Sequence, residues 1–543
     1  MNKWVGPLLV AAMLAAMLVI DALTIREDSL TYDEPIHYRY GAQVLDGDSS
    51  RFIDGTMPVT ALNALLQRLG KALAPGPIRD YLQRVPSGRW VTILFSLLLG
   101  YFVFKWSREL YGTGAGLFSL LLYTFSPNII AHGRLITTDV YAAGMVTLST
   151  YYFWRFLGRG GWKLAVTTAV FLGLSQLAKY SCMFLYPIFL LIVVVRYWSE
   201  LVRLLRARDL KGLGGHLKPF FRFAVLFALV SILIINAGFL FNRSFVPFGE
   251  YQLRSEALKS FQARHPVLGR VPVPLPYPYL DGLDWGKMRE ETGKGFGSMY
   301  LFGQLRETGG FKGYYFFAFL FKEPIAFQIL IALAAIFYIV KRRRYAFLRN
   351  EAFLVVPVVF YFIYLNFFFK LQIGIRHYLV AVPLIQVFCG SLVSQWQGYG
   401  RRMKSAIVVL LAYLVISVMS YFPYYIPYFN ELVWDRKQAY KILADSNIDW
   451  GQTSKQAREF KAKHPDACLE EGLWRIKTYR DKHMEEYLHP EFPDSGLLVV
   501  NVNNYVGIQH PQRYKWLRDN YKPIGQVAYA LLIFNISPRD TTR

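Results

Sequence analysis

Two adjacent carboxylates, Asp33 and Glu34, follow the first apolar run of the chain. A carboxylate that is partly desolvated beside a membrane can act as a general base toward an acceptor hydroxyl. Two neighbouring carboxylates could instead bind a divalent cation, or they could be ordinary solvated loop acids. The pair is therefore the first candidate catalytic group.

A third acidic residue, Asp139, stands where a later apolar run begins. A carboxylate at that place is often only a helix N-cap, a role that Thr137 or Thr138 could share. Arg134 lies near enough in sequence for an ion pair. Asp139 is thus a second candidate catalytic carboxylate with two structural alternatives.

Several cations also border apolar runs. Lys179 is flanked closely by apolar sequence, where an ammonium at mid-membrane costs about 2.5–3.5 kcal/mol; it could extend to the interface or bind a phosphate. Arg376 and His377 begin another run, where an arginine fork and helix amides suit a phosphate, although His377 could also merely cap. Lys322 and Glu323 do not face each other on a helix, so at least one of them needs another partner.

The elements that position these residues are membrane spans. The chain is 54% hydrophobic and 17% aromatic, too apolar for a soluble protein of this length. Eleven apolar runs are long enough to cross about 30 Å of hydrocarbon. They lie near residues 4–23, 90–106, 115–132, 138–156, 163–178, 181–197, 221–241, 314–340, 352–369, 376–394 and 405–422. We read the first run as an uncleaved span, because no convincing signal-peptide cleavage site follows it.

The charges of the loops predict the orientation. With the N-terminus in the cytoplasm, the inner loops carry 20 Lys or Arg and 3 acids, whereas the outer segment 24–88 carries 7 bases and 8 acids. This asymmetry is the positive-inside pattern, and the basic run 341–344 is its clearest marker. It also accounts for the net charge of +24 without a nucleic-acid partner. The three cysteines indicate no disulfide framework.

The predicted fold class is an α-helical polytopic membrane protein with a small soluble α/β domain. Residues 1–422 form the membrane module, with outer loops at 24–88 and 242–313. Apolar residues spaced between Val59 and Leu69 predict an amphipathic helix lying on the membrane. Residues 423–543 form the outer domain, with helical patterns near 436–463, 470–488 and 510–520 and strand patterns at 497–502 and 527–536.

This topology brings the acids and the cations to the outer end of the bundle. Cations near the bilayer boundary suit the phosphate of a lipid carrier, and carboxylates beside them suit activation of a hydroxyl. Together they indicate glycosyl transfer from a lipid-phosphate sugar.

At these residues the sequence resembles the GT-C superfamily, and within it the bacterial members of the protein O-mannosyltransferase and lipid A aminoarabinose transferase group. The resemblance covers nearly the whole chain and rests on the order of several short motifs. These are residues 32–35, 131–139, 178–181, 313–324, 376–379, 425–431 and 445–452.

The resemblance implies an inverting transfer from a polyprenyl-phosphate sugar to a hydroxyl of a protein, lipid or glycan. Asp33 would be the base, with Glu34 beside it, and Asp139 the second acid. Lys179 and Arg376 match the cations that bind the carrier phosphate, joined by His377; Lys322 is in doubt because Glu323 replaces the family's threonine. No cofactor is implied with certainty, and a divalent cation remains open.

The implied location is a bacterial inner membrane, with the site and the tail domain extracytoplasmic. Two other functions stay open. Intramembrane charges and broken helices also occur in transporters, so a flippase for lipid-linked sugars is one alternative. A catalytically inert assembly scaffold is the other. Asp445, Asp449 and Trp450 in the tail could recognise an acceptor, although a structural role is the simpler interpretation.

Overall fold

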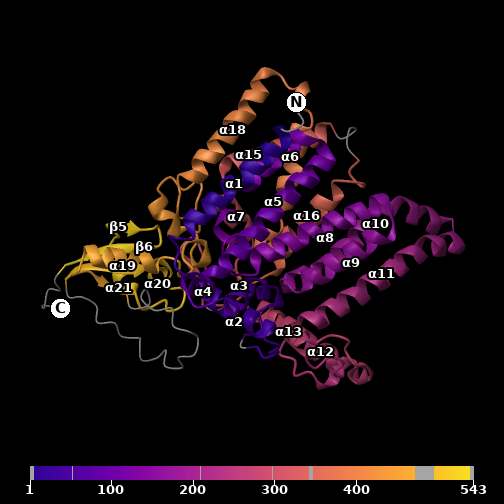
Figure 1. Ribbon diagram of the computed structural model, residues 1–543, viewed down its shortest axis with the longest axis horizontal. Helices are drawn as coiled ribbons and strands as arrows, with labels where there is room; N and C mark the ends of the chain where they lie inside the picture. Colours follow the sequence, from indigo (N-terminus) through magenta and orange to yellow (C-terminus); the bar gives the residue numbers. More distant parts are fainter. Residues whose placement is uncertain are drawn as a thin grey trace.

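A computed structural model describes residues 5–51, 53–207, 209–295, 297–341, 346–470 and 495–537. Most of them are helical (Figure 1). The N-terminus and the start of α18 lie at one end of the helical bundle, and the short helices α2, α3, α12 and α13 lie at the other. The C-terminal sheet packs at the side of this second end. The sequence-derived interpretation of a helical membrane module with a small α/β domain is confirmed.

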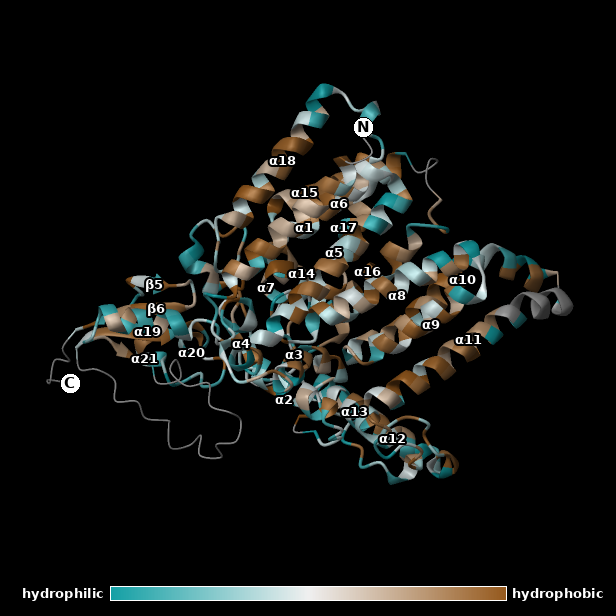
Figure 2. Ribbon diagram, viewed as in Figure 1, coloured by the Kyte–Doolittle hydropathy of each residue, from teal (hydrophilic) through white to brown (hydrophobic). Residues whose placement is uncertain are grey.

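Helices occupy each of the eleven predicted apolar runs. Among the described residues, five helices are long and apolar enough to cross a membrane; α14 and α15, bent by 111° at their junction, pass the same test only as a pair, as a broken span or a re-entrant loop would. Pro324 stands at that break, as expected for a helix that loses a backbone donor. Figure 2 shows that the coloured part of α11 and most of α18 consist largely of hydrophobic residues. The chain is therefore an integral membrane protein.

The bundle contains long helices and several shorter or broken ones. They are α1 (Val5–Thr24), α5 (Arg89–Tyr111), α6 (Thr113–Thr124), α7 (Pro127–His132), α8 (Asp139–Arg159), α9 (Trp162–Gln176), α10 (Leu185–Arg206), α11 (Leu210–Gly238), α14 (Tyr314–Lys322), α15 (Ile325–Val340), α16 (Ala352–Ile363), α17 (Val382–Val393) and α18 (Arg401–Met419). The 3-10 segments η3 (Tyr180–Phe184) and η8 (Ile375–Val380) precede α10 and α17, and the π-helical turn η7 (Tyr364–Phe368) ends α16.

The two segments predicted to be outer loops, 24–88 and 242–313, are also structured. The first contains α2 (Glu34–Leu45), η1 (Pro58–Thr60), α3 (Ala61–Lys71), α4 (Pro77–Leu82) and η2 (Val85–Gly88). The second contains η4 (Phe248–Glu250), α12 (Glu256–Arg264), η5 (Pro266–Arg270), α13 (Tyr277–Thr292) and the hairpin β1 (Met299–Leu301) with β2 (Gln304–Arg306). The predicted amphipathic helix is α3, which leaves Leu62, Leu65 and Leu69 exposed.

The tail folds around a four-stranded sheet of order β3-β4-β6-β5. Its strands are β3 (Cys468–Leu469), β4 (Gly496–Asn501), β5 (Gly525–Val527) and β6 (Leu531–Ile536). The sheet is mixed, because β3 and β4 are parallel and the other neighbours antiparallel. The helical segments of the tail are η10 (Arg436–Lys441), η11 (Asp445–Asn447), α19 (Ser454–Lys463), α20 (Val502–Val506) and α21 (Lys515–Asn520).

The two longest helical patterns predicted in the tail are not seen as single helices in the described residues. The pattern at 436–463 is not one helix, because only Ser454–Lys463 is α-helical. Before α19 the chain is mostly irregular and packs against the membrane module, so tertiary contacts override the local helical pattern there. The helix expected at 470–488 falls almost wholly outside the described residues, as do positions 342–344 of the basic run.

Candidate active site

Four of the predicted residues meet in one chain of alternating charges. Lys179 Nζ lies 2.5 Å from Asp139 Oδ1. Arg376 Nη1 lies 3.7 Å from Asp139 Oδ2 and 3.3 Å from Asp33 Oδ2. These residues come from the start of α2, the start of α8, the turn before η3 and η8 itself. The fold thus joins positions more than 300 residues apart in sequence at one site.

The two aspartates of this cluster differ in exposure. The Asp139 side chain is 1% exposed and touches both cations, whereas that of Asp33 is 35% exposed. The N-cap of α8 is Thr138, whose side chain makes no capping hydrogen bond, and Arg134, the ion-pair partner considered for Asp139, instead pairs with Asp28 at 2.6 Å. Asp139 is therefore the anchor that holds two cations side by side, and Asp33 is the carboxylate that a substrate can reach.

Glu34 does not share the setting of Asp33. It is fully buried, and its carboxylate accepts hydrogen bonds from Arg89 at 2.8 and 2.6 Å and from the amides of Thr31 and Ile136. Burial alone would raise its pKa, but the Arg89 charge and these bonds together hold the pKa below the ordinary value. The geometry argues against the predicted catalytic role, because every carboxylate oxygen is engaged. Glu34 instead anchors the turn that carries Asp33.

Breaking this anchor should destabilise the protein. We expect Glu34→Gln to lower the free energy of unfolding by about 3–5 kcal/mol, because a buried Arg89 loses its counter-charge. The loss should shrink as the pH falls through the depressed pKa of Glu34, where the wild-type carboxylate is itself protonated. Thermal unfolding in detergent measures both effects.

The matched control is Glu27→Gln, which removes a partly exposed partner of Lys455 at 2.9 Å. It should cost less than about 1 kcal/mol. Equal unfolding temperatures for the two variants would contradict the anchoring role of Glu34.

Lys322 is also placed differently from its predicted phosphate-binding role. Its side chain is buried, and Nζ donates to the backbone oxygens of Ile426 and Asn447, each at 2.6 Å. The ring of Phe429 lies 4.8 Å from the ammonium. Lys322 therefore ties the bent α14–α15 pair to the tail, a role that sequence could not show because both partners are backbone atoms far along the chain.

Histidines around the charge cluster retain unused hydrogen-bonding atoms. Among the described residues, no hydrogen-bond partner meets His37 Nδ1, His132 Nδ1 or His377 Nε2, and the same holds for Arg376 Nε and for Asp139 Oδ2, whose ion pair with Arg376 is too long for a hydrogen bond. Such buried groups are normally satisfied in folded proteins. The cluster thus has unused capacity to bind a polar ligand.

His37 is a site residue that the sequence reasoning missed. It stands one helical turn after Asp33, and its amide donates to the Asp33 carbonyl at 3.1 Å. Burial lowers the pKa of its imidazole, against the opposing fields of Asp33 and Asp139. Its spacing of four residues from Asp33 was the available signal, because residues i and i+4 share a helix face. His377, which was predicted, packs on Phe369 with ring centroids 5.3 Å apart.

The acidic pair Asp33 and Glu34 was also considered as a site for a divalent cation. Within the described ranges, no group of three or more His, Cys, Asp and Glu side chains could hold one. The cation considered for Asp33 and Glu34 would need both carboxylates, and Glu34 is already engaged by Arg89. The acidic pair therefore does not form a two-carboxylate site.

The tail contributes directly to the cluster. The indole of Trp450 covers Arg376, with the guanidinium carbon 3.9 Å from the ring centroid. Burial raises the pKa of Asp445 to about 6; the charge of Arg376 lowers this pKa and that of Asp33 raises it. Asp449, in contrast, is held inside the tail by Asn501 and Thr453. Of the three tail residues considered, two face the site and one is structural.

The raised pKa of Asp445 has a consequence for stability. The folded state binds this proton more tightly than the unfolded chain, so its stabilising effect is complete below pH 4 and is lost as the pH rises through about 6. At pH 7.5, Asp445→Asn should therefore be more stable than wild type by about 1–3 kcal/mol.

The difference should diminish toward pH 4, which thermal unfolding across pH tests. Asp519→Asn is the control, because Asp519 is exposed in the same domain. A gain for Asp445→Asn that is equal at pH 4 and pH 7.5 would contradict the charge-based explanation.

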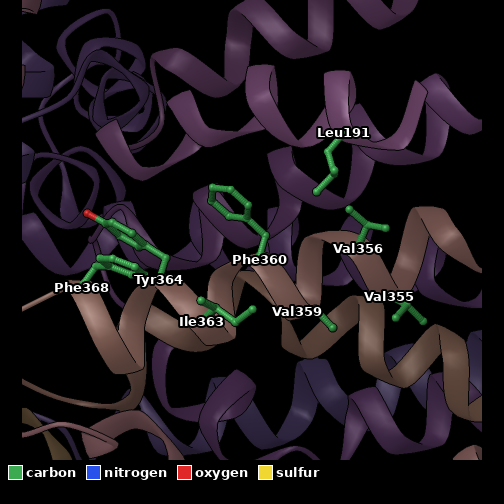
Figure 3. A pocket seen from close by; sticks show the side chains of 8 residues that line it. All are labelled: Leu191, Val355, Val356, Val359, Phe360, Ile363, Tyr364 and Phe368. Carbon is green, nitrogen blue, oxygen red and sulfur yellow. The ribbon is translucent and has the colours of Figure 1, made fainter. Parts of the chain in front are cut away.

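An apolar groove lies between α16 and α10 (Figure 3). It has a volume of about 400 Å³ and is formed by α16 and η7 with Leu191 of α10 opposite (Figure 3). Tyr364 and Phe368 lie at one end of it. From there the ring of Phe369 connects Tyr364, at 6.0 Å, to His377, at 5.3 Å. The end of the groove at Tyr364 is thus two ring contacts away from His377, the residue next to Arg376.

One family comparison bears on this arrangement. Residues 83–206 match the family of dolichyl-phosphate-mannose-protein mannosyltransferases. The match covers less than a quarter of the chain and shows that this segment is similar to that family. The matched segment includes Asp139 and Lys179, whereas Asp33 and Arg376 come from outside it. No curated protein sequence matches the chain.

Solved structures give weaker likenesses. ArnT from Cupriavidus metallidurans bound to undecaprenyl phosphate aligns over 98% of this chain and 99% of its own, with 10% identity and a TM-score of 0.47. The apo oligosaccharyltransferase of Archaeoglobus fulgidus aligns over 77% of this chain and 55% of its own, with 14% identity and a TM-score of 0.45. Both TM-scores lie below 0.5, so neither likeness supports an inference about this chain's ligands.

Proposed function

We propose that the protein transfers a sugar from a polyprenyl-phosphate carrier to a hydroxyl acceptor at the extracytoplasmic face of the membrane. The observation that carries the proposal is the pairing of Lys179 and Arg376 through one buried aspartate, with the more exposed Asp33 alongside. Two adjacent cations suit a phosphate, and an accessible carboxylate next to them suits a hydroxyl.

The reaction follows from these positions. The acceptor oxygen attacks the anomeric carbon, and the bond from that carbon to the phosphate oxygen breaks. The hydroxyl proton passes to Asp33, and polyprenyl phosphate leaves with the bonding electron pair. Lys179 and Arg376 neutralise the charge that develops on the phosphate, which is the largest contribution expected from fixed groups in such a site. In-line attack inverts the configuration at the anomeric carbon.

The apolar groove supports a lipid carrier rather than a soluble sugar nucleotide. Leu191, Val359 and Phe360 offer a surface with no polar partner for a nucleotide. An isoprenoid chain lying there would direct its phosphate toward His377 and Arg376, since the groove ends at Tyr364 and Phe368 and the ring of Phe369 lies between Tyr364 and His377. Burial of such a chain would be favourable at roughly 25 cal/mol per Å² of apolar surface.

Transfer of label from the carrier tests the proposal. Membranes from cells with and without the gene are incubated with a polyprenyl-phosphate sugar labelled in the sugar. We expect label to leave the carrier, and free polyprenyl phosphate to accumulate, only where the protein is present. A flippase or a scaffold would leave the sugar on its carrier, and that result would overturn the proposal.

A further inference from the structure

The segment of the tail that enters the site is residues 445–452, here called the tail strap. It contacts the membrane module on both sides of the charge cluster. Trp450 O accepts from the amide of Tyr32, the neighbour of Asp33, at 3.0 Å. Asn447 Oδ1 accepts from the amide of Ile375, the neighbour of Arg376, at 3.0 Å. The strap therefore joins the backbones that carry Asp33 and Arg376.

The strap is held firmly at both of its faces. Toward the membrane module, Lys322 Nζ donates to Asn447 O, and Asn447 Nδ2 donates to the Tyr314 hydroxyl at 2.9 Å. Toward the tail sheet, Asn501 Nδ2 donates to Asp449 Oδ2 at 2.7 Å. A fixed strap can hold a side chain in one position, which a mobile tail could not.

Two glycines allow the tail strap to pack closely against the membrane module. Gly374, directly before η8, faces Ser446, and a side chain at 374 would collide with the Ser446 hydroxyl. Gly451 adopts φ +93°, and a Cβ there would meet the ring of Tyr32 at 3.2 Å. Both glycines thus let the strap approach the site on either side of Arg376.

Arg376 is the residue on which these contacts converge. Its Nη1 points at Asp33 and Asp139, Trp450 covers one face of the guanidinium, and Nε has no partner among the described residues. A cation stacked on an indole is stabilised most when the pair is desolvated. Trp450 is buried, so the stack fixes the plane of the fork and excludes water from that face.

We propose that Trp450 is a positioning residue for Arg376, so that the tail strap completes the phosphate-binding half of the active site. This inference rests on the proposed function, because it assigns Arg376 a phosphate to bind. It gives the tail domain a direct part in donor binding, distinct from recognition of the acceptor.

Binding of polyprenyl phosphate to the purified full-length protein tests the inference without any acceptor. Trp450→Ala should weaken binding about tenfold, and Trp450→Phe, which keeps an aromatic face, should stay within about threefold of wild type. Trp434→Ala is the control, because Trp434 is 98% exposed in the same tail. It should not change binding.

A double-mutant comparison separates positioning from general stability. In an Arg376→Ala background, Trp450→Ala should change binding by less than about twofold, because the two residues act as one unit. A full tenfold loss in that background would overturn the inference, and so would an alanine variant that binds as wild type does. If Trp450→Ala does not fold, Trp450→Leu replaces it, since leucine keeps apolar volume without a π face.

The wild-type protein distinguishes this inference from the proposed function. If wild type binds and consumes the donor while Trp450→Ala behaves identically, only the positioning role is wrong. If wild type binds no polyprenyl phosphate, both are wrong.

Discussion

Replacing Asp33 by asparagine should lower kcat for sugar transfer by about 10²–10⁴-fold, the usual contribution of a general base. Asp33 is the accessible carboxylate of the charge cluster, and asparagine keeps its shape but cannot accept the proton. Donor binding should persist or become tighter, because Arg376 loses a competing carboxylate 3.3 Å away. Steady-state transfer assays with separate measurement of polyprenyl-phosphate binding resolve the two effects.

Asp46→Asn is the matched control for this variant. Asp46 follows α2 in the same segment between α1 and α5, and its side chain is well exposed and only loosely paired with Lys71 at 3.8 Å. It should transfer sugar at the wild-type rate. An Asp33→Asn protein with nearly normal kcat would show that the base lies elsewhere, and His37 would be the next residue to test.

Replacing Arg376 by alanine should lower kcat/KM for the donor by about 10²–10³-fold, the loss that follows removal of one charged or polar group from a developing anion. Both donor binding and kcat should fall, since the guanidinium meets the phosphate before and during bond breaking. Arg376→Lys should restore little, because a lysine point charge cannot replace a planar fork that stacks on Trp450 and reaches two carboxylates.

The control for Arg376 is another stacked arginine. Arg436 lies 4.3 Å over the ring of Tyr421, outside the charge cluster, and donates to Ser420. Arg436→Ala should leave kcat/KM within about twofold of wild type. Equal losses for the two arginine variants would indicate a general effect of arginine–aromatic stacking on folding and would contradict a phosphate-binding role for Arg376.

Sequence reasoning placed the site well at the level of elements. The apolar runs are helical, and Asp33, Asp139, Lys179 and Arg376 do meet. Periodicity and charge asymmetry report which end of a helix a residue occupies. Polar residues at the same end of a helical bundle share a small region, so the sequence could predict that these four residues lie close together.

Pairing within the cluster could not be predicted. Asp33 and Glu34 are adjacent and chemically alike, yet only Glu34 meets the buried Arg89. Successive residues at a helix start point in different directions, so adjacency gives no shared environment. Arg134 pairs with Asp28, although Asp139 is nearer in the sequence. Lys322 bonds backbone carbonyls, whose positions carry no sequence signature.

The tail strap shows a different limit. Residues 436–463 have helical spacing, but the strap gains side-chain and backbone partners on two domains that a helix would forgo. Local propensity is worth at most about 1 kcal/mol per ordinary residue, so several such bonds outweigh it. The sequence analysis could therefore single out Trp450 but could not predict that it lies beside Arg376.

The most direct test of the account is an experimental structure of the protein with polyprenyl phosphate bound. We predict phosphate oxygens within hydrogen-bonding distance of Lys179 Nζ and the Arg376 guanidinium, with the isoprenoid chain in the groove between α10 and α16. A phosphate bound at the other end of the bundle, or one that contacts neither cation, would contradict it.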